Sequence, residues 1–587
     1  MNSDNAPLVI LGVNGVYHES SAAIVIDGHT KFAIEEERLN RVKHAKPAGL
    51  DNPHVLPHNA ISECLKFTEL SMKDVDIIAF SFNPAKRLAK HRYLQEPCEP
   101  HSWGTVQAER AYFDKLMTIP RQFAELGFAG QFMWVDHEMA HAASAFYPSP
   151  YEQSAIISID GIGEFESASI GYAQGNDIQF THHINYPHSI GFLWEKMAKY
   201  LGFSEYDACK VMSVASFGDS ARYKKQMQSL LYPEGFGFKV DADTLCFRLE
   251  DYSHLTALFN VSRRHDHEPL LAVHHDIAAA LQAVTSEVLL HLAKSAHELT
   301  GSNNLCMAGG VALNCVANTV LFEEGPFENL YIQPAANDAG TALGAALWAY
   351  HGVLQSNTRV PQPEHTYLGS SFDDAAIRAV LDNADVTYTQ HDDLAERVAQ
   401  LLAQGKVIGW FQGAMEFGPR ALGNRSLLAD PRDPEMVKRL NRLVKHREDH
   451  RPFCPSVLTE YADQWFEIKK QAEAARYMLM AYPANEQLKD KIPAVVHIDG
   501  TSRIQRVDKV SNPNYHAVIS AFNRLTGVPM LLNTSFNDRE PIVCTPQNAV
   551  NTLMRTNIDF LVIGSYLVLS NAKNTRTKNH AEAQALA

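Results

Sequence analysis

Two histidines separated by three residues are the first chemical feature of this 587-residue sequence. His137 and His141 stand in HEMAH, and positions i and i+4 share one face of a helix, so both imidazoles could bind one metal ion. HExxH is also the zincin motif, in which Glu138 would be the general base of a metalloprotease. Without a metal, the histidines would simply be neighbours on a helix face. We favour a metal site completed by acidic residues from elsewhere in the chain.

Two aspartates could complete such a site. Asp160 ends a predicted strand, AIISI, and Asp338 opens a predicted helix in ANDAGTALGAAL. Two histidines and two aspartates form a mixed nitrogen and oxygen donor set that suits iron, manganese or zinc. The residues alone do not choose among these metals.

Glycine-containing turns between predicted strands could hold phosphate groups. The turns begin at Asn14 and at residues 160–163 (DGIG), and backbone N–H groups in such turns bind phosphate oxygens, although tight turns require glycine anyway. Residues 309–310, both glycine, could place a nucleotide at a helix N-terminus. Lys210 could add a positive charge to this phosphate site or could be a solvated loop lysine.

A basic stretch stands out in an acidic chain. Residues 420–451 contain nine lysines and arginines and five acidic residues, whereas the whole chain has a formal charge of −15. Arginine suits bidentate recognition of phosphate or carboxylate, which predicts a small anionic substrate. The segments HIDGTSRIQ and LLNTSFND supply polar groups for the walls of the same pocket. The acidic total argues against a nucleic-acid partner.

The elements that must position these residues begin with a repeat. Residues 8–37 and 155–184 both read as strand, polar turn, strand, tight turn, strand, with Asp-Gly at 27–28 in the first copy. A long helix is predicted over residues 274–299, strands over 304–307 and 329–333, and a helix of small residues over 336–350. These patterns predict a mixed α/β lobe with two related halves.

A proline-containing polar stretch at residues 352–366 predicts a boundary. We expect a first domain over residues 1–360, a second α/β domain over 361–570 and a flexible tail over 571–587. In the second domain we expect strands at 406–411, 477–482, 503–507, 528–532 and 560–564, and helices at 434–446, 515–525 and 546–555.

Composition bounds the class of protein. Hydrophobic residues make up 45% of the chain, which is enough for large cores. No apolar run approaches the roughly 18–20 residues of a membrane span, and the N-terminus lacks the basic region of a signal peptide. The eight cysteines form no CxxC pair. We therefore expect a cytoplasmic protein with no membrane partner.

Long motifs along the chain resemble one known family. They include HESSAAIVIDG, VDHEMAHAASAFY, DGIGE, AGGVALNC, ANDAGTALGAA, MEFGPRALGNRSLLADPR, REDHRPFCPS and LLNTSFND. These motifs are similar to those of O-carbamoyltransferases of the NodU/CmcH type, which modify antibiotics and nodulation factors. The resemblance implies an N-terminal actin-like, TsaD-like lobe and a C-terminal YrdC-like α/β lobe. Glu138 stands where the family often has histidine, so the zincin match is accidental on this reading.

The resemblance also implies an activity: carbamoyl phosphate and ATP would give carbamoyl-adenylate, and a hydroxyl of a small natural product would take the carbamoyl group. It implies carbamoyl-phosphate contacts from Arg420, Lys445, Arg447, Arg451 and Asn533, with Lys445 and Arg447 taking part in catalysis. It implies an iron site of His137, His141, Asp160 and Asp338, and His18 as the base for the acceptor. Nucleotide contacts would come from Asn14, Gly161, Gly163, Lys210, Gly309, Gly310 and Asn314.

Two other functions stay open at this stage. The shared lobes would also suit a tRNA-modifying enzyme that makes threonylcarbamoyladenosine, although the charge of −15 offers no obvious RNA track. A non-enzymatic, nucleotide-gated binding protein would need only the duplicated turns. The identity of the acceptor and the oligomeric state have no signal in the sequence.

Overall fold

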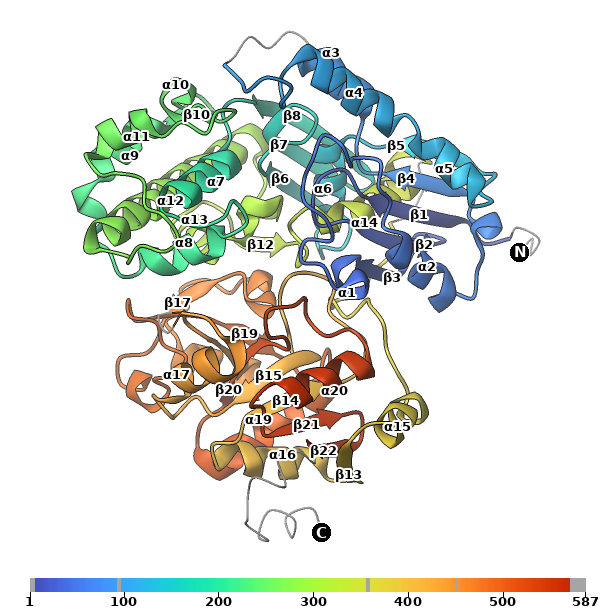
Figure 1. Cartoon of the computed structure of the whole chain (residues 1–587), viewed down its shortest axis with the longest axis vertical. Coiled ribbons are helices and arrows are strands. Elements are labelled where there is room, and N and C mark those ends of the chain that lie inside the picture. Colours follow the sequence, from blue (N-terminus) through green and yellow to red (C-terminus); the bar gives the residue numbers. More distant parts are fainter. Residues whose placement is uncertain (1–5, 92–96, 355–358, 449–450, 571–587) are drawn as a thin grey trace. The chain divides into compact units, whose positions relative to one another are not determined.

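The computed structural model describes residues 6–91, 97–354, 359–448 and 451–570, and the chain divides into two compact units (Figure 1). Unit 1 contains Met1–Asn40, His44–Pro363 and Lys470–Ala474. Unit 2 contains Arg41–Lys43, Glu364–Lys469 and Ala475–Ala587. The predicted tail, 571–587, lies outside the described residues.

Unit 1 contains two five-stranded sheets with the same strand order. The first sheet has the order β3-β2-β1-β4-β5, and the second, read from the equivalent edge, has the order β8-β7-β6-β11-β12. In each sheet the first three strands are antiparallel, and the last two run parallel to the third. The first sheet comprises β1 (Val9–Asn14), β2 (Ser21–Ile26), β3 (His29–Glu35), β4 (Ile77–Phe80) and β5 (Gln131–Trp134). The second comprises β6 (Gln153–Ile159), β7 (Glu166–Gln174), β8 (Asp177–Asn185), β11 (Asn304–Ala308) and β12 (Asn329–Ile332). This repeat confirms the expected duplication of the α/β lobe, and the actin-like assignment stays a prediction.

The turn between β2 and β3 shows how local sequence starts this repeat. Asp27 and Gly28 both have positive φ, at 50° and 80°. A two-residue hairpin turn of this kind needs positive φ at both positions, which Asp-Gly tolerates well. The predicted hairpin is therefore confirmed.

Two helices of small residues pack on the two sheets and on each other (Figure 1). Helix α14 (Ala339–Trp348) lies on β1 and β2, and α6 (His137–Phe146) lies on β6 and β11. A Cβ atom on Gly344 of α14 would stand 1.8 Å from the carbonyl oxygen of Ala140 in α6. A Cβ on Gly12 of β1 would stand 1.9 Å from the carbonyl oxygen of Ala342. Because glycine has no side chain, the backbones of α6, α14 and β1 can approach this closely.

Helix α12 (Ala272–Thr300) forms the core of the second half, where it packs against α13 (Cys315–Glu323) and α8 (Ala208–Ala215). By length and mean hydropathy it could cross a membrane, although polar and charged residues interrupt its apolar positions. However, 78% of its most apolar window is buried inside the protein. Burial of this extent is typical of a core helix, which is apolar on all sides.

Unit 2 is built on one mixed sheet of eight strands in the order β13-β22-β21-β14-β15-β20-β16-β19. The strands are β13 (Val386–Gln390), β14 (Ile408–Phe411), β15 (Arg425–Ala429), β16 (Cys454–Leu458), β19 (Gln505–Val507), β20 (Met530–Ser535), β21 (Phe560–Ile563) and β22 (Tyr566–Ser570). Helices α16 (Leu394–Ala403) and α19 (Pro513–Thr526) pack together, and α20 (Pro546–Arg555) packs on β21 and β14. The α/β class is confirmed, and the YrdC-like assignment of this unit stays a prediction.

Three expected elements of unit 2 differ in the structure. The single strand expected over 503–507 is two short strands of different sheets, β18 (Thr501–Arg503) and β19. Residues 477–482 were expected to be a strand, but a 3-10 turn (Glu473–Tyr477) is followed by the short strand β17 (Ala481–Pro483). The apolar run there is buried without a regular period, and such a run signals burial rather than strand. The helix expected over 434–446 is α17 (Met436–Leu440) followed by a π-helical turn (Asn441–Lys445).

A stability measurement tests the role of the helix contact. Gly344→Ala should cost about 3 kcal/mol or more in the free energy of unfolding, because the new methyl group overlaps backbone rather than a flexible side chain. Gly235→Ala is the control: no atom lies within 4 Å of its Cβ, so only the left-handed backbone adds a cost, of about 1 kcal/mol. Equal losses for the two variants in denaturant titrations would contradict the account.

Candidate active site

The two histidines of HEMAH lie in the first turns of α6, and both are buried. The Nδ1 atom of His137 is 3.4 Å from the carbonyl oxygen of Ser81, to which it can donate. Its Nε2 atom has no hydrogen-bond partner among the described residues. A metal-ligating histidine usually donates one ring N–H to a carbonyl or carboxylate oxygen, which leaves the other ring nitrogen free to bind the metal.

Glu164, in the DGIGE motif, fixes the start of α6. This fully buried carboxylate accepts hydrogen bonds from the backbone N–H groups of His137, at 2.9 Å, and Asn83, at 2.7 Å. Burial raises the pKa of Glu164 to about 7, against the opposing charge of Lys86. The predictions gave Glu164 no role, although a carboxylate four residues after Asp160 was visible in the sequence.

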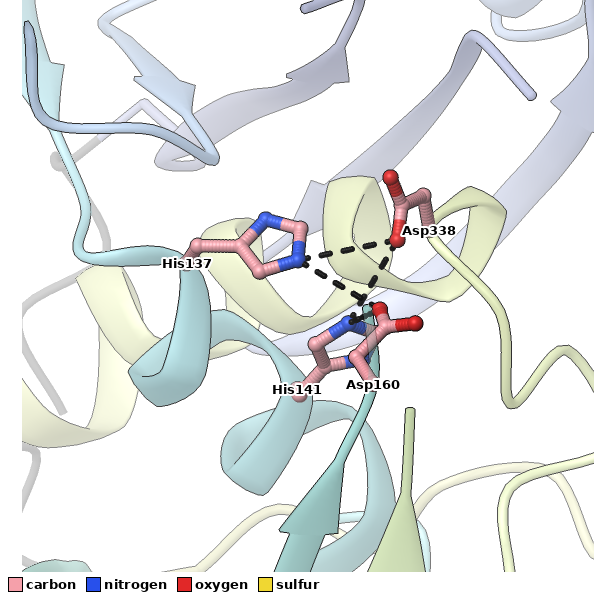
Figure 2. A group of neighbouring side chains, drawn as sticks. All are labelled: His137, His141, Asp160 and Asp338. Atoms are coloured by element: carbon pink, nitrogen blue, oxygen red, sulfur yellow. Dashed lines mark hydrogen bonds and ion pairs between the residues drawn. The ribbon is translucent and has the colours of Figure 1, made fainter. Parts of the chain in front are cut away.

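Four side chains converge at one point (Figure 2). Asp160 follows β6, and Asp338 immediately precedes α14. The Oδ2 atom of Asp160 lies 3.0 Å from Nε2 of His141 and 3.7 Å from Nε2 of His137, and Oδ1 of Asp338 lies 3.6 Å from both nitrogens. One ligand atom from each residue lies within 4.8 Å of all the others. The structure thus brings together the four residues predicted from three distant segments.

The charges of this group are strongly coupled. Burial alone would lower the pKa of His137, but the charge of Asp338 and the contacts with both aspartates raise it well above the usual value. Burial alone would raise the pKa of Asp160, but hydrogen bonds from the two histidines hold it well below the usual value. These shifts favour protonated imidazoles beside an ionised Asp160.

The donor set fits a divalent metal ion. Two neutral imidazoles and two carboxylates would balance the charge of a dication, and the unpartnered Nε2 of His137 is oriented toward the group. Glu138 fits a zincin base poorly, because it is 1% exposed and neither carboxylate oxygen has a hydrogen-bond partner in the described structure. The four-residue group, rather than HExxH alone, is the candidate metal centre.

The predicted glycines surround this centre. A Cβ on Gly163 would lie 3.1 Å from His137, and a Cβ on Gly310 would lie 3.0 Å from Oδ1 of Asp160. Gly309 has φ of +94°, and a Cβ there would overlap the carbonyl of Ile159. The backbone N–H of Gly161 donates to Asp160 Oδ1 at 2.8 Å. Glycine at these positions lets backbone approach the centre closely.

Three other predicted nucleotide contacts already have protein partners. The amide of Asn14 donates to the carbonyl of Glu19, and Asn314 caps α13 and pairs with the amide of Gln282. The ammonium of Lys210 lies 3.0 Å from Asp207, three residues earlier on the chain. Their contacts with a nucleotide stay predictions.

His18 lies beside the metal group on a shared cavity. The cavity has a volume of about 420 Å³, and its lining includes His18, Gly161, Asp160 and Asp338. The Nδ1 atom of His18 lies 3.8 Å from a carboxylate oxygen of Glu19. An imidazole in this position could take a proton from a molecule in the cavity.

Unit 2 holds a second candidate site around Lys445. Its buried ammonium donates to Ser535 Oγ at 3.1 Å and to Asn537 Oδ1 at 2.6 Å. Asn533 stands two residues before Ser535 on β20, so both side chains share one face of the strand. The Oδ1 atom of Asn533 has no hydrogen-bond partner among the described residues. Ser535 and Asn537 were absent from the predicted site, although both lie in the quoted segment LLNTSFND.

The positive charges of unit 2 concentrate at this point. Burial lowers the pKa of Lys445 well below its usual value, and the charges of Arg447 and Arg451 lower it further. The Nε of Arg447 donates to Asn441 at 2.7 Å, and Arg420 directly precedes Ala421, whose carbonyl accepts from Asn533. Clustered cations with one buried lysine are typical of a site that binds an anion.

Comparisons with known proteins match both units. The family model described as Carbamoyltransferase N-terminus matches residues 9–347, and the model described as Carbamoyltransferase C-terminus matches residues 399–570. An uncharacterized protein of Synechocystis is 36% identical over 97% of this chain and 98% of its own length. Nodulation protein NolNO of Sinorhizobium fredii is 36% identical over 94% of this chain and 79% of its own length. Full-length HypF aligns at 14% identity with a TM-score of 0.32, over 60% of this chain and 56% of that structure.

Metal binding tests the convergent group. His141→Ala and Asp338→Asn should each weaken binding of Fe²⁺ or Zn²⁺ by at least the roughly 10–100-fold that outer-shell changes cost, measured by calorimetry. His267→Ala is the control, because this exposed histidine lies outside the group. The pKa values of His137 and His141 are raised by the neighbouring carboxylates, so metal competes with protons for both rings and its affinity should fall as the pH is lowered. A metal affinity that changes neither with the substitutions nor with pH would contradict the assignment.

Anion binding tests the cluster in unit 2. Inorganic phosphate should raise the melting temperature of the protein, and at 100 times Kd it should add about 2.7 kcal/mol of stability. Lys445→Met should abolish most of this response, whereas Lys438→Met, an exposed lysine paired with Glu435, should keep it. Because burial lowers the pKa of Lys445, its charge and the phosphate response should decline as pH rises through that lowered pKa. An unchanged response in Lys445→Met would exclude this site.

Proposed function

Since the chain belongs to the carbamoyltransferase family, we propose that it is an ATP-dependent O-carbamoyltransferase that acts on a small hydroxylated molecule. Carbamoyl transfer is the activity of the family. The use of ATP, the adenylate intermediate and the natural-product acceptor are our proposal. The observation that carries it is the shared cavity, on which His18 lies beside two carboxylates of the candidate metal centre.

The first step falls to unit 2. Arg420, Lys445, Arg447 and Arg451 would neutralise the phosphate of carbamoyl phosphate, and Asn533 Oδ1 could accept a hydrogen bond from the carbamoyl NH₂. Water would cleave carbamoyl phosphate to carbamate and phosphate. Carbamate decomposes readily in water, so an enclosed site would limit its loss.

The second and third steps follow from the residues of unit 1. A carbamate oxygen would attack the α-phosphorus of ATP, and pyrophosphate would leave, giving carbamoyl-adenylate. The acceptor hydroxyl would then attack the carbamoyl carbon, its proton would pass to His18, and AMP would leave. The glycines at 161, 163, 309 and 310 would allow nucleotide phosphates to approach, and Asn14, Lys210 and Asn314 are the remaining proposed contacts.

A divalent cation held by His137, His141, Asp160 and Asp338 would supply Lewis-acid stabilisation of phosphate oxygens. We propose iron(II), since a site of histidines and carboxylates suits it. We also propose that the protein works in the cytoplasm, because its eight cysteines are free thiols.

Mass spectrometry of the reaction tests this function and its division between units. Wild-type protein with carbamoyl phosphate, ATP and Fe²⁺ should form carbamoyl-adenylate without any acceptor. Arg420→Ala should reduce adenylate formation at least 100-fold if its charge stabilises the transition state, whereas His18→Asn should retain adenylate formation. Metal-loaded, folded protein that forms no adenylate would refute the proposal, and equal losses in both variants would refute the division of roles.

A further inference from the structure

The cavity beside His18 has the size of a small-molecule site. Its volume of about 420 Å³ falls within the range of roughly 300–1,000 Å³ that is typical of such sites. All of its lining residues belong to unit 1. Asp160 and Asp338 lie on the lining with His18, so a molecule that fills the cavity reaches the candidate metal centre.

Aromatic rings form much of the wall. Tyr17 and Trp103 have ring centroids 6.3 Å apart, and Phe192 and Phe247 have centroids 5.8 Å apart. Tyr206 meets the ring of His18 edge-on at 5.4 Å. Rings presented in this way favour a ligand with a flat, partly apolar face.

The positive charges of the wall are already engaged by the protein. The ammonium of Lys196 donates to the backbone carbonyls of Cys246 and Leu249, at 3.3 and 2.7 Å. Lys199 pairs with Glu250 at 2.8 Å.

The guanidinium groups are engaged as well. Arg87 makes a bidentate contact with Glu109, at 2.9 and 3.0 Å. The Nε of Arg248 donates to Tyr186 at 2.9 Å, and this guanidinium also lies 3.8 Å from Glu109. The lysine and arginine side chains of the wall are therefore all held in contacts with other groups of the protein.

Two carboxylates of the wall, unlike the lysines and arginines, are not engaged by protein partners among the described residues. Glu195 and Glu205 line the cavity, and neither makes a hydrogen bond or a salt bridge within the described part of the chain. Burial raises the pKa of Glu195 to about 7; the charge of His18 opposes this rise, and the charges of Asp160 and Glu205 add to it. A half-buried carboxylate in this environment gains most from a cation placed beside it.

We propose that the acceptor is a ring-containing alcohol with a protonated amine, which Glu195 and Glu205 bind while its hydroxyl faces His18. This inference rests on the proposed O-carbamoyl transfer. The aromatic wall takes the ring, and the two carboxylates take the ammonium group.

The pairing also directs the chemistry to oxygen. A free amine is a stronger nucleophile than a hydroxyl, but an ammonium group has no lone pair with which to attack. The hydroxyl oxygen therefore bonds to the carbamoyl carbon, the bond from that carbon to the phosphate oxygen breaks, AMP leaves with the electron pair, and the hydroxyl proton goes to His18. The product is an O-carbamate with its amine intact.

A series of benzylic alcohols that differ in charge tests the proposal. The probes are 4-(aminomethyl)benzyl alcohol, its N-acetyl derivative and 4-(hydroxymethyl)benzoate, each with metal-loaded full-length protein, carbamoyl phosphate and ATP. The kcat/KM for O-carbamoylation should be at least about tenfold higher for the cation than for the N-acetyl compound, as one hydrogen bond to a charged group provides. The benzoate should be the poorest substrate.

Substitutions locate the origin of this preference. In Glu195→Gln with Glu205→Gln, the ratio of kcat/KM between the cation and the N-acetyl compound should fall toward one, through a higher KM for the cation. Glu328→Gln, an exposed glutamate outside the cavity, should keep the wild-type ratio. Urea products, which would form if the amine of the aminomethyl probe took the carbamoyl group, should be absent in the wild type.

Adenylate formation separates failure of this inference from failure of the proposed function. If adenylate forms but the cation is not preferred, or is not carbamoylated at all, the acceptor proposal is overturned and the proposed function stands. If the preference survives in the Glu195→Gln, Glu205→Gln protein, the assignment to these carboxylates is overturned. If no adenylate forms, the proposed function fails, and this inference fails with it.

Discussion

Helices α6 and α14 meet with no side chain between their backbones at Gly344, where the carbonyl of Ala140 occupies the space of a Cβ atom. The candidate metal centre depends on this contact. His137 and His141 come from α6, Asp338 precedes α14, and Asp160 follows β6, a strand on which α6 packs. Residues from 137 to 338 can share one ion only if the two helices stay this close. Small residues at the contact therefore place the chemistry, although they take no part in it.

The elements and site residues that the sequence predicts correctly are those that depend on short-range patterns, such as turn residues and helical spacing. The Asp27-Gly28 hairpin, the repeated strand order and helix α20 follow from turn residues and periodicity. The histidine pair follows from i, i+4 spacing, Asp160 from the end of a predicted strand and Asp338 from the start of a predicted helix. The role of Glu164 was not predictable, because a carboxylate that binds the N-terminus of a helix from a distant loop has no local pattern. The strand expected at residues 477–482 failed because apolar burial alone does not specify a strand.

Charged side chains are arranged differently at the two candidate sites. Unit 2 concentrates cations around the buried Lys445 in a chain whose total charge is −15. Unit 1 presents carboxylates to its cavity and keeps its lysines and arginines in contacts with the protein. An anionic donor in one unit and an acceptor of opposite charge in the other would account for both patterns. In this proposal, the cations of unit 2 would offset the desolvation cost of burying the anionic donor, and the carboxylates of unit 1 would do the same for the cationic acceptor.

Exchange of labelled pyrophosphate into ATP tests the central claim most directly, because it reports the adenylate step without any acceptor. The account predicts that label enters ATP only when carbamoyl phosphate and a divalent metal are both present, and that Asp338→Asn abolishes the exchange. Exchange without carbamoyl phosphate, or carbamoylation of an alcohol with no exchange at all, would contradict it.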